Sequence, residues 1–174
     1  MTTPNRAAVI AATRTSILMD LANANAALQR MAAANTAALR AQHFRDFLHP
    51  ARQVLNRFSG AANALGFNQQ GAALFETWLS RRENALEQEA WDVVTDLRHE
   101  NTHRAPVAAE RTNAILLTNA GAGIVVNSHG NVVTVAIDEV TSSGKRYNCL
   151  QVATVCMGLL SRFVDELETA LAPQ

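Results

Sequence analysis

The sequence of 174 residues contains few of the residues that mark special classes of protein. It has two cysteines, four prolines and eight glycines, and only 5% of its residues are aromatic. Lysine occurs once, at Lys145, so fourteen of the fifteen cationic residues are arginines. Fifteen acidic residues balance these fifteen cations, which excludes a strongly basic coat for nucleic acid and a strongly acidic disordered tail. Any site for a polyanion must therefore be local.

Long hydrophobic runs are also missing. No stretch approaches the about 20 consecutive apolar residues of a membrane span, and residues 1–6 lack a basic leader followed by an apolar run. We therefore expect a soluble cytoplasmic protein with no membrane partner, folded as one domain over residues 1–174. Cys149 and Cys156 are expected to be free thiols, because seven helical residues would separate their Cα atoms by about 10 Å.

The spacing of apolar residues predicts a largely helical fold. A seven-residue apolar repeat in the first part of the chain predicts a long Ala-rich helix that continues as far as Pro50, with these positions on one face: Ile10, Ile17, Ala24, Met31 and Ala38. A shorter helix is expected to end at Gly60. This shorter helix covers residues 51–59, and two further helices are predicted over residues 72–104 and 148–171.

Between the last two predicted helices the chain becomes apolar and β-branched. Two such runs, 115–126 and 132–137, flank a polar segment typical of a turn, residues 127–131. We expect an antiparallel hairpin there, as an insertion over about residues 115–138. The predicted fold class is all-α, a bundle of about four helices with a β-hairpin inserted before the C-terminal helix.

One segment carries residues suited to chemistry. Residues 98–103 read Arg-His-Glu-Asn-Thr-His, at the end of the helix predicted for residues 72–104. Four apolar residues fall within one arc of about 100° and form the predicted core face of this helix: Ala90, Val93, Val94 and Leu97. Arg98, His99 and His103 lie away from that face, so we expect them to be displayed. Cations at a helix C-terminus also stabilise the helix dipole without any further function.

The spacing of Arg98, His99 and His103 resembles the signature of the HEPN family (higher eukaryotes and prokaryotes nucleotide-binding): an arginine, a polar residue, three residues and a histidine. The bundle and the insertion before the last helix resemble that family too. The resemblance implies a metal-independent endoribonuclease without a cofactor, of the toxin or defence-effector type, with a composite site in a homodimer. It implies RNA as substrate and an antitoxin protein as a candidate partner. Ala105 occupies the position at which some antitoxin-paired members carry a tyrosine.

The residue types suit RNA cleavage for physical reasons as well. RNA supplies its own nucleophile, the 2′-hydroxyl, so the protein must provide a base, an acid and positive charge. His103 is the candidate acid or base, Arg98 the candidate stabiliser of transition-state charge, and His99 a supporting hydrogen-bond donor. The neighbouring candidates for substrate binding are Asn101, Thr102 and Arg104.

Two alternatives remain open. His99, Glu100 and His103 also match the His-Glu-x-x-His pattern of zinc enzymes, in which two histidines bind the metal and the glutamate activates water. Arginines on both sides disfavour a bound cation, and a third ligand would have to come from Glu110, His129 or Glu139. The other alternative is a non-catalytic dimeric helical module that binds a nucleotide, RNA or a protein.

Two lesser features have structural interpretations. Trp78 and Trp91 are expected in the core, because tryptophans in a bundle more often pack than stack on bases. Lys145 and Arg146 follow Gly144 and form a basic turn that we expect to be solvated.

Overall fold

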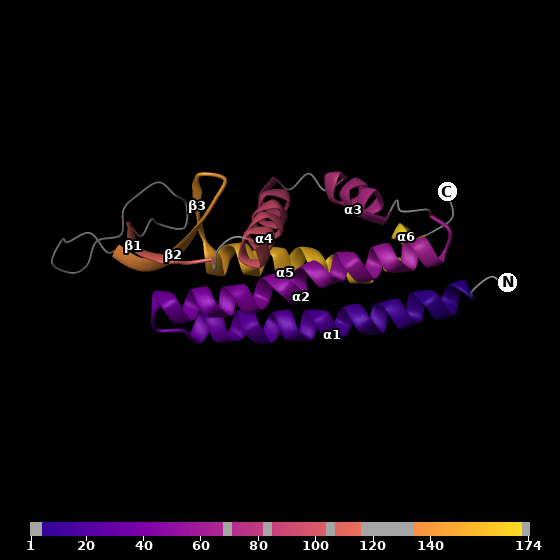
Figure 1. The fold of residues 1–174 in the computed structure, drawn as a ribbon, viewed down its shortest axis with the longest axis horizontal. Helices are drawn as coiled ribbons and strands as arrows, with labels where there is room; N and C mark the ends of the chain where they lie inside the picture. The colour runs from indigo at the N-terminus through magenta and orange to yellow at the C-terminus, as the bar shows by residue number, and fades with distance from the viewer. Residues whose placement is uncertain (1–4, 68–70, 82–84, 104–106, 116–133, 172–174) are drawn as a thin grey trace.

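The computed structural model describes residues 5–67, 71–81, 85–103, 107–115 and 134–171 (Figure 1). Most of these residues are helical, and the remainder form a small antiparallel sheet. In chain order the elements are α1 (Arg6–Ala33), α2 (Ala37–Ala64), α3 (Gly71–Ser80), α4 (Ala85–His103), β1 (Glu110–Ile115), β2 (Thr134–Ser142), β3 (Lys145–Asn148), α5 (Cys149–Asp165) and α6 (Leu167–Ala170).

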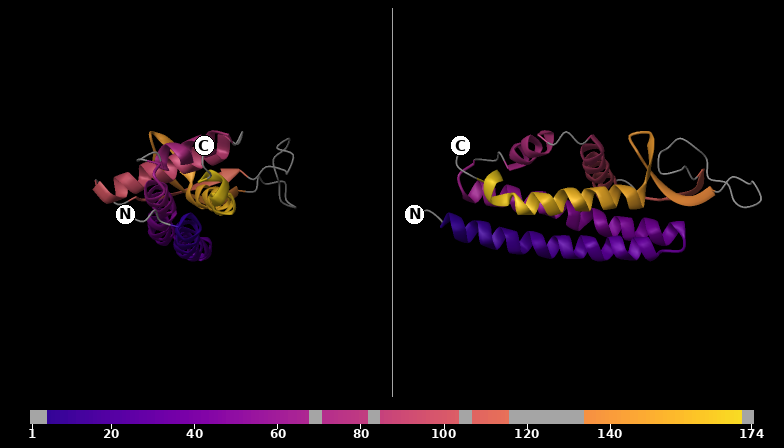
Figure 2. Two further views of the ribbon diagram at one scale, coloured as in Figure 1. Left: turned by 90° about the vertical axis from the view of Figure 1, so that its right-hand side faces the viewer. Right: turned by 180° about the vertical axis from the view of Figure 1, so that it is seen from behind.

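Three long helices, α1, α2 and α5, lie side by side along the long axis of the molecule (Figure 1). Helix α4 crosses them and extends to one side of the α1–α2 pair (Figure 2, left). The sheet lies at one end of the molecule, and α6 lies near the start of α1 at the other. The predicted all-α class is therefore confirmed in its broad form. None of the described helices is long and apolar enough to cross a membrane.

The chain reverses at residues 34–36, where the sequence predicted a continuous helix. Thr36 caps the second helix, because its side chain accepts a hydrogen bond from the Leu39 backbone N–H at 3.2 Å. The prediction of a helix that ends at Pro50 is wrong, since Pro50 lies buried inside α2. Ala38, predicted as a core position, is exposed near the start of α2.

The rest of the predicted seam is confirmed. The four residues from Ile10 to Met31 in the seven-residue repeat are all buried in α1: Ile10, Ile17, Ala24 and Met31. Helix α1 packs along its length against α2 and also contacts α5. The shorter helix predicted for residues 51–59 is part of α2, which passes through Gly60 without a break.

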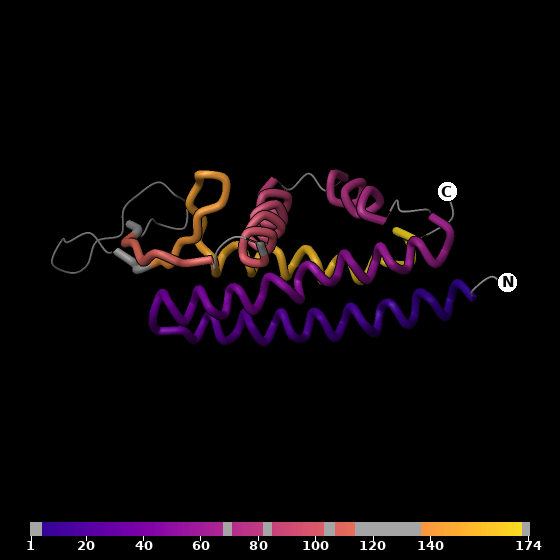
Figure 3. The backbone as a smooth tube through the Cα atoms, in the orientation of Figure 1, coloured from indigo at the N-terminus to yellow at the C-terminus, as the bar shows by residue number. Residues whose placement is uncertain are grey.

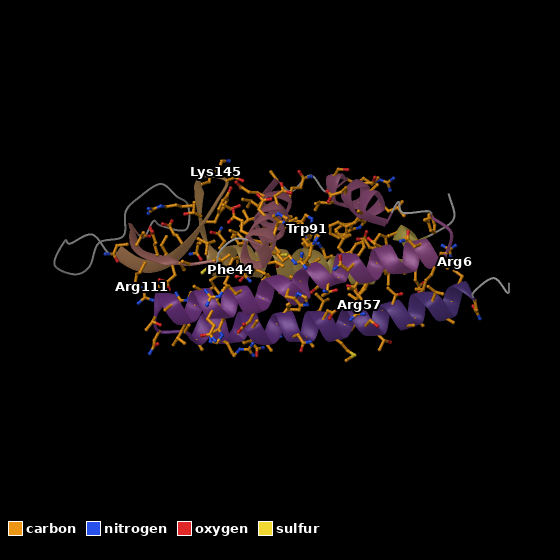
Figure 4. All side chains as sticks on the ribbon, viewed as in Figure 1. Arg6, Phe44, Arg57, Trp91, Arg111 and Lys145 are labelled. Atoms are coloured by element: carbon orange, nitrogen blue, oxygen red, sulfur yellow. The ribbon has the colours of Figure 1, made fainter. Side chains whose placement is uncertain are left out.

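Charged residues from distant parts of the chain hold the turn between α1 and α2. Arg40 Nε donates to the carbonyl of Met31 at 3.0 Å, and Arg40 Nη1 donates to Asp138 Oδ2 at 2.7 Å. Arg111 reaches both carboxylate oxygens of Asp138, at 2.8 and 2.9 Å, and also the carbonyl of Asn35 at 3.2 Å. The Asp138 side chain is 0% exposed. Figure 4 shows Arg111 beside this turn. The hydrogen bonds of Arg111 and Asp138 therefore connect the sheet to the turn between α1 and α2.

The helix predicted for residues 72–104 is two helices, α3 and α4, that run in different directions (Figure 3). A straight helix would separate Phe75 and Trp91 by about 24 Å. Their ring centroids are instead 4.8 Å apart, and both rings belong to an aromatic cluster with Phe163 and Trp78. Packing of these rings against α5 therefore requires the chain to fold back. It also confirms the prediction that both tryptophans are core residues, with exposures of 8% and 1%.

The sheet differs from the predicted hairpin in its strands. β1 pairs with β2 antiparallel, from Glu110 opposite Glu139 to Ile115 opposite Thr134. The predicted pairing of 115–126 with 132–137 falls mostly on residues 116–133, which lie outside the described residues. A third strand, β3, was not predicted; it follows β2 through a tight turn with positive φ at Ser143 (49°) and Gly144 (77°), as two-residue hairpins require.

The last long helix begins where the sequence predicts it. Asn148 is its N-cap, and its side chain accepts hydrogen bonds from the Leu150 and Gln151 N–H groups. The helix ends at Asp165, earlier than the predicted residue 171, and is followed by the short α6. Seven of its predicted core residues, including the one in α6, are buried: Val152, Cys156, Leu159, Leu160, Phe163, Val164 and Leu167.

Candidate active site

Helix α4 carries the candidate motif and is fixed by its apolar side. Each of the four residues of the predicted core face is at most 5% exposed: Ala90, Val93, Val94 and Leu97. Contacts with α2 and α5 bury this face. Arg98, the first residue of the motif, directly follows buried Leu97 and therefore lies at the margin of the core.

Arg98 is half-buried rather than displayed as expected. Its Nε atom is buried and has no hydrogen-bond partner among the described residues. Buried polar groups are paired in most proteins, and an unpaired charged donor is costly. The rotation of α4 that buries Leu97 brings this donor to the junction of α4 and α2, where an additional partner would be favourable.

Arg52 of α2 lies at the same junction, although no sequence motif points to it. Its guanidinium carbon is 5.4 Å from the ring centroid of Trp91, which Figure 4 labels on the side of α4 toward α3. Burial lowers the pKa of Arg52, and the neighbouring Arg98 cation lowers it further. Glu76 opposes these effects but contributes less. The charges of two arginines from different helices thus interact at this junction.

Two of the predicted substrate-binding residues make local hydrogen bonds. Asn101 Oδ1 accepts from the Val107 backbone N–H at 3.4 Å, and Arg45 of α2 donates to the Val107 carbonyl. These bonds hold the chain after α4 against α2. The Thr102 hydroxyl is exposed and donates to the Arg98 carbonyl at 2.9 Å. Asn101 therefore positions the end of the motif helix.

The histidines of the motif are described unequally. His99 is exposed on α4, and Glu100 beside it is half-buried. The backbone of His103 forms the last residue of α4, but its side chain lies outside the described part of the chain, as does all of Arg104. The exposed side of the last two turns of α4 thus presents Arg98 together with His99 and Thr102.

An acidic groove adjoins the side of α4 that carries His99, because Asp92 and Asp96 precede His99 and His103 by seven residues, which is two helical turns. Glu89, Asp92 and Asp96 line a groove of about 590 Å³ between α4 and the β2–β3 turn. Burial raises the pKa of Asp92, and the carboxylates of Asp96 and Glu89 raise it further. A polyanion would be repelled from this groove.

The zinc alternative gains no support from the described residues. Among them, no three histidine, cysteine, aspartate or glutamate side chains are grouped to hold a metal ion. The proposed third ligands Glu110 and Glu139 both face Arg146, at 3.1 and 3.9 Å. His129 lies outside the described residues.

The basic turn has acidic partners, as its solvated interpretation predicts. Lys145 Nζ lies 3.8 Å from Glu89 Oε1, and Arg146 faces the two glutamates of the sheet. Figure 4 shows Lys145 at the tip of the β2–β3 hairpin. Neighbouring glutamates therefore largely balance the positive charges of this turn.

Comparisons of the chain with protein-family models, with curated proteins and with solved structures find no match. The function is consequently argued from the residues at the α2–α4 junction and from the motif on α4.

Proposed function

We propose that this protein is a metal-independent endoribonuclease with a HEPN-like fold. The observation that carries the proposal is the Arg98-His99-x-x-x-His103 motif on the last two turns of α4, with Arg98 held half-buried beside Arg52. The motif precedes a β-sheet insertion and a final core helix, α5, which is the arrangement that the HEPN resemblance implies. Asp92 and Asp96 lie on the side of α4 that carries His99 and His103, so the positive charge that anionic RNA requires comes from Arg98 and Arg52.

The chemistry needs only groups that RNA and the motif contain. A neutral histidine removes the proton of the 2′-hydroxyl, and the resulting oxygen attacks the adjacent phosphorus. Arg98 stabilises the negative charge of the phosphorane through charge-assisted hydrogen bonds. A protonated histidine then donates to the departing 5′-oxygen. The products are a 2′,3′-cyclic phosphate and a 5′-hydroxyl, and no metal or cofactor takes part.

One chain supplies a single His103, whereas the reaction uses one base and one acid. A homodimer that places two α4 motifs in one composite site supplies both from His103 and its symmetry copy, with His99 as a supporting hydrogen-bond donor. Such an enzyme acts as a cytoplasmic toxin or defence effector, with an antitoxin protein as its regulator. Dimerisation is tested by sedimentation of the active protein, since a catalytically competent monomer would contradict the composite site.

The residue roles are tested by RNA cleavage rates in excess EDTA for three variants. We expect His103→Ala to lose at least about 100-fold in rate, because general acid–base catalysis contributes about 10²–10⁴-fold. Arg98→Ala should lose at least about 100-fold as well, because a donor that stabilises transition-state charge contributes about 10²–10³-fold. Glu100→Ala should retain activity within a few-fold. A larger loss in Glu100→Ala, together with zinc in the purified protein, would favour the zinc alternative. RNA binding without any cleavage by the wild type would favour the non-catalytic module.

A further inference from the structure

Within the part of the chain that the structure describes, helix α4 carries an unpaired buried polar group, Thr95 Oγ1, in addition to Arg98 of the motif. The Arg98 Nε and the Thr95 Oγ1 atoms are both buried and have no hydrogen-bond partner among the described residues. Thr95 lies one turn before Arg98 on α4, and Trp91 one turn earlier again. At about 100° per residue these three positions fall within an arc of about 60°, so they share one edge of the helix.

Arg52 is fixed at this edge by packing. Its guanidinium lies over the ring of Trp91, which is only 1% exposed. A planar guanidinium on an aromatic face keeps its N–H donors in the plane of the group and directed outward. Arg52 therefore brings the guanidinium donors of α2 to Trp91 of α4.

The charges at this junction are unfavourable in the protein alone. The Arg98 cation lowers the pKa of Arg52, and this repulsion exceeds the opposing attraction of Glu76. Half-buried cations repel each other more strongly than exposed ones, because solvent screens them less. An anion between the two guanidinium groups would turn the repulsion into attraction and would give Arg98 Nε a partner.

We propose that Arg52 and Arg98 together bind a phosphate group, with Arg52 as a phosphate-binding residue outside the Arg-His motif. Tetrahedral oxyanions match the ligand that two guanidinium forks prefer, since each fork can donate two parallel hydrogen bonds. Identification of that phosphate as an RNA phosphodiester rests on the proposed ribonuclease function. The phosphate site itself follows from the α2–α4 junction.

The test is binding of a 2′-O-methyl RNA oligonucleotide, which lacks the nucleophile and cannot be cleaved by this route. Fluorescence anisotropy compares the wild type with Arg52→Met, which keeps an apolar stem over Trp91 but removes the charge. We expect affinity to fall at least about tenfold, as for loss of a charge-assisted hydrogen bond, and the salt dependence to fall by about one released counterion. Arg52→Lys should recover part of the affinity.

The matched control is Arg57→Met, which removes the same charge from α2 on the side that pairs with Asp20 of α1. Its affinity should stay within about twofold of the wild type. A second readout is the melting temperature in inorganic phosphate, which should rise for the wild type and stay constant for Arg52→Met. This readout also shows whether the variant is folded.

The outcomes separate the phosphate site from the ribonuclease. If Arg52→Met binds the oligonucleotide and inorganic phosphate as the wild type does, the phosphate site is refuted and the ribonuclease proposal stands. If Arg52-dependent binding occurs but no RNA is cleaved, the phosphate site stands and the ribonuclease proposal fails. Arg52-dependent binding of inorganic phosphate alone would support the site and exclude RNA as its ligand.

Discussion

Asp138→Asn should cause a large loss of stability, because the carboxylate joins the sheet to the turn between α1 and α2. It is 0% exposed and accepts three charge-assisted hydrogen bonds, at 2.7 Å from Arg40 and at 2.8 and 2.9 Å from Arg111. Removing one partner of a buried ion pair costs about 3–5 kcal/mol. Asparagine retains one acceptor oxygen, so we expect a loss of about 3 kcal/mol, or about 6–12 °C in melting temperature.

The assay is urea denaturation followed by circular dichroism, with Asp165→Asn as the control. Asp165 pairs with Arg14 at 4.0 Å, and their side chains are 78% and 47% exposed, so its loss should cost under about 1 kcal/mol. Equal losses of unfolding free energy in the two variants would refute the stabilising role of the buried Asp138 carboxylate.

The pH dependence of the difference provides a second check. The hydrogen bonds from Arg111, and the positive charges of Arg40 and Arg111, lower the pKa of Asp138, although burial opposes them. The carboxylate therefore contributes its full stability above the unfolded pKa of about 3.9. That contribution is lost as the pH falls through the lower folded pKa, so the wild type and Asp138→Asn should converge in strong acid. A constant difference across that range would contradict the assignment.

Three further substitutions or treatments follow from local features. Burial raises the pKa of Cys149 to about 11 and that of Cys156 to about 12. Neither thiol should therefore react with a thiol reagent at pH 8 until urea unfolds the protein. Rapid labelling of the native protein would contradict this expectation. Asn148→Ala removes the cap of α5 and should cost about 1 kcal/mol in urea denaturation. Gly144→Ala should cost about 1–2 kcal/mol, because its φ of 77° is left-handed; an unchanged midpoint would argue against that turn.

Helix faces were predictable because they depend on local periodicity. The buried side of α4 and the core stripe of α5 match the apolar spacing of the sequence, and Asn148 is a recognisable cap. The same periodicity did not predict the burial of Arg98, which was expected to be displayed and is half-buried beside Leu97. The free, buried state of Cys149 and Cys156 follows from their helical spacing.

Chain reversals were less predictable, because distant residues stabilise them. The turn at residues 34–36 depends on Arg111 and Asp138 from the sheet. The break between α3 and α4 has no proline or glycine signal and follows from packing of Trp91 and Phe75 in one cluster. Pro50 was over-interpreted, since tertiary packing of α2 tolerates a proline that would weaken an isolated helix.

The same limit applies to the site. The motif residues are close in sequence and share α4, so their spacing could be recognised directly. Arg52 belongs to another helix, and only the crossing of α2 and α4 brings it to Arg98. Asn101 was assigned to substrate binding, whereas its side chain accepts from Val107, a contact that requires the chain to turn back after α4.

Ribonuclease chemistry at the α4 motif is tested most directly by the ends of the RNA fragments. Wild type and His103→Ala are incubated with a mixed RNA pool in excess EDTA, and fragments that end in a 2′,3′-cyclic phosphate are quantified. We expect such fragments from the wild type and at least about 100-fold fewer from His103→Ala. No fragments from the wild type, or equal amounts from both proteins, would contradict the proposed function.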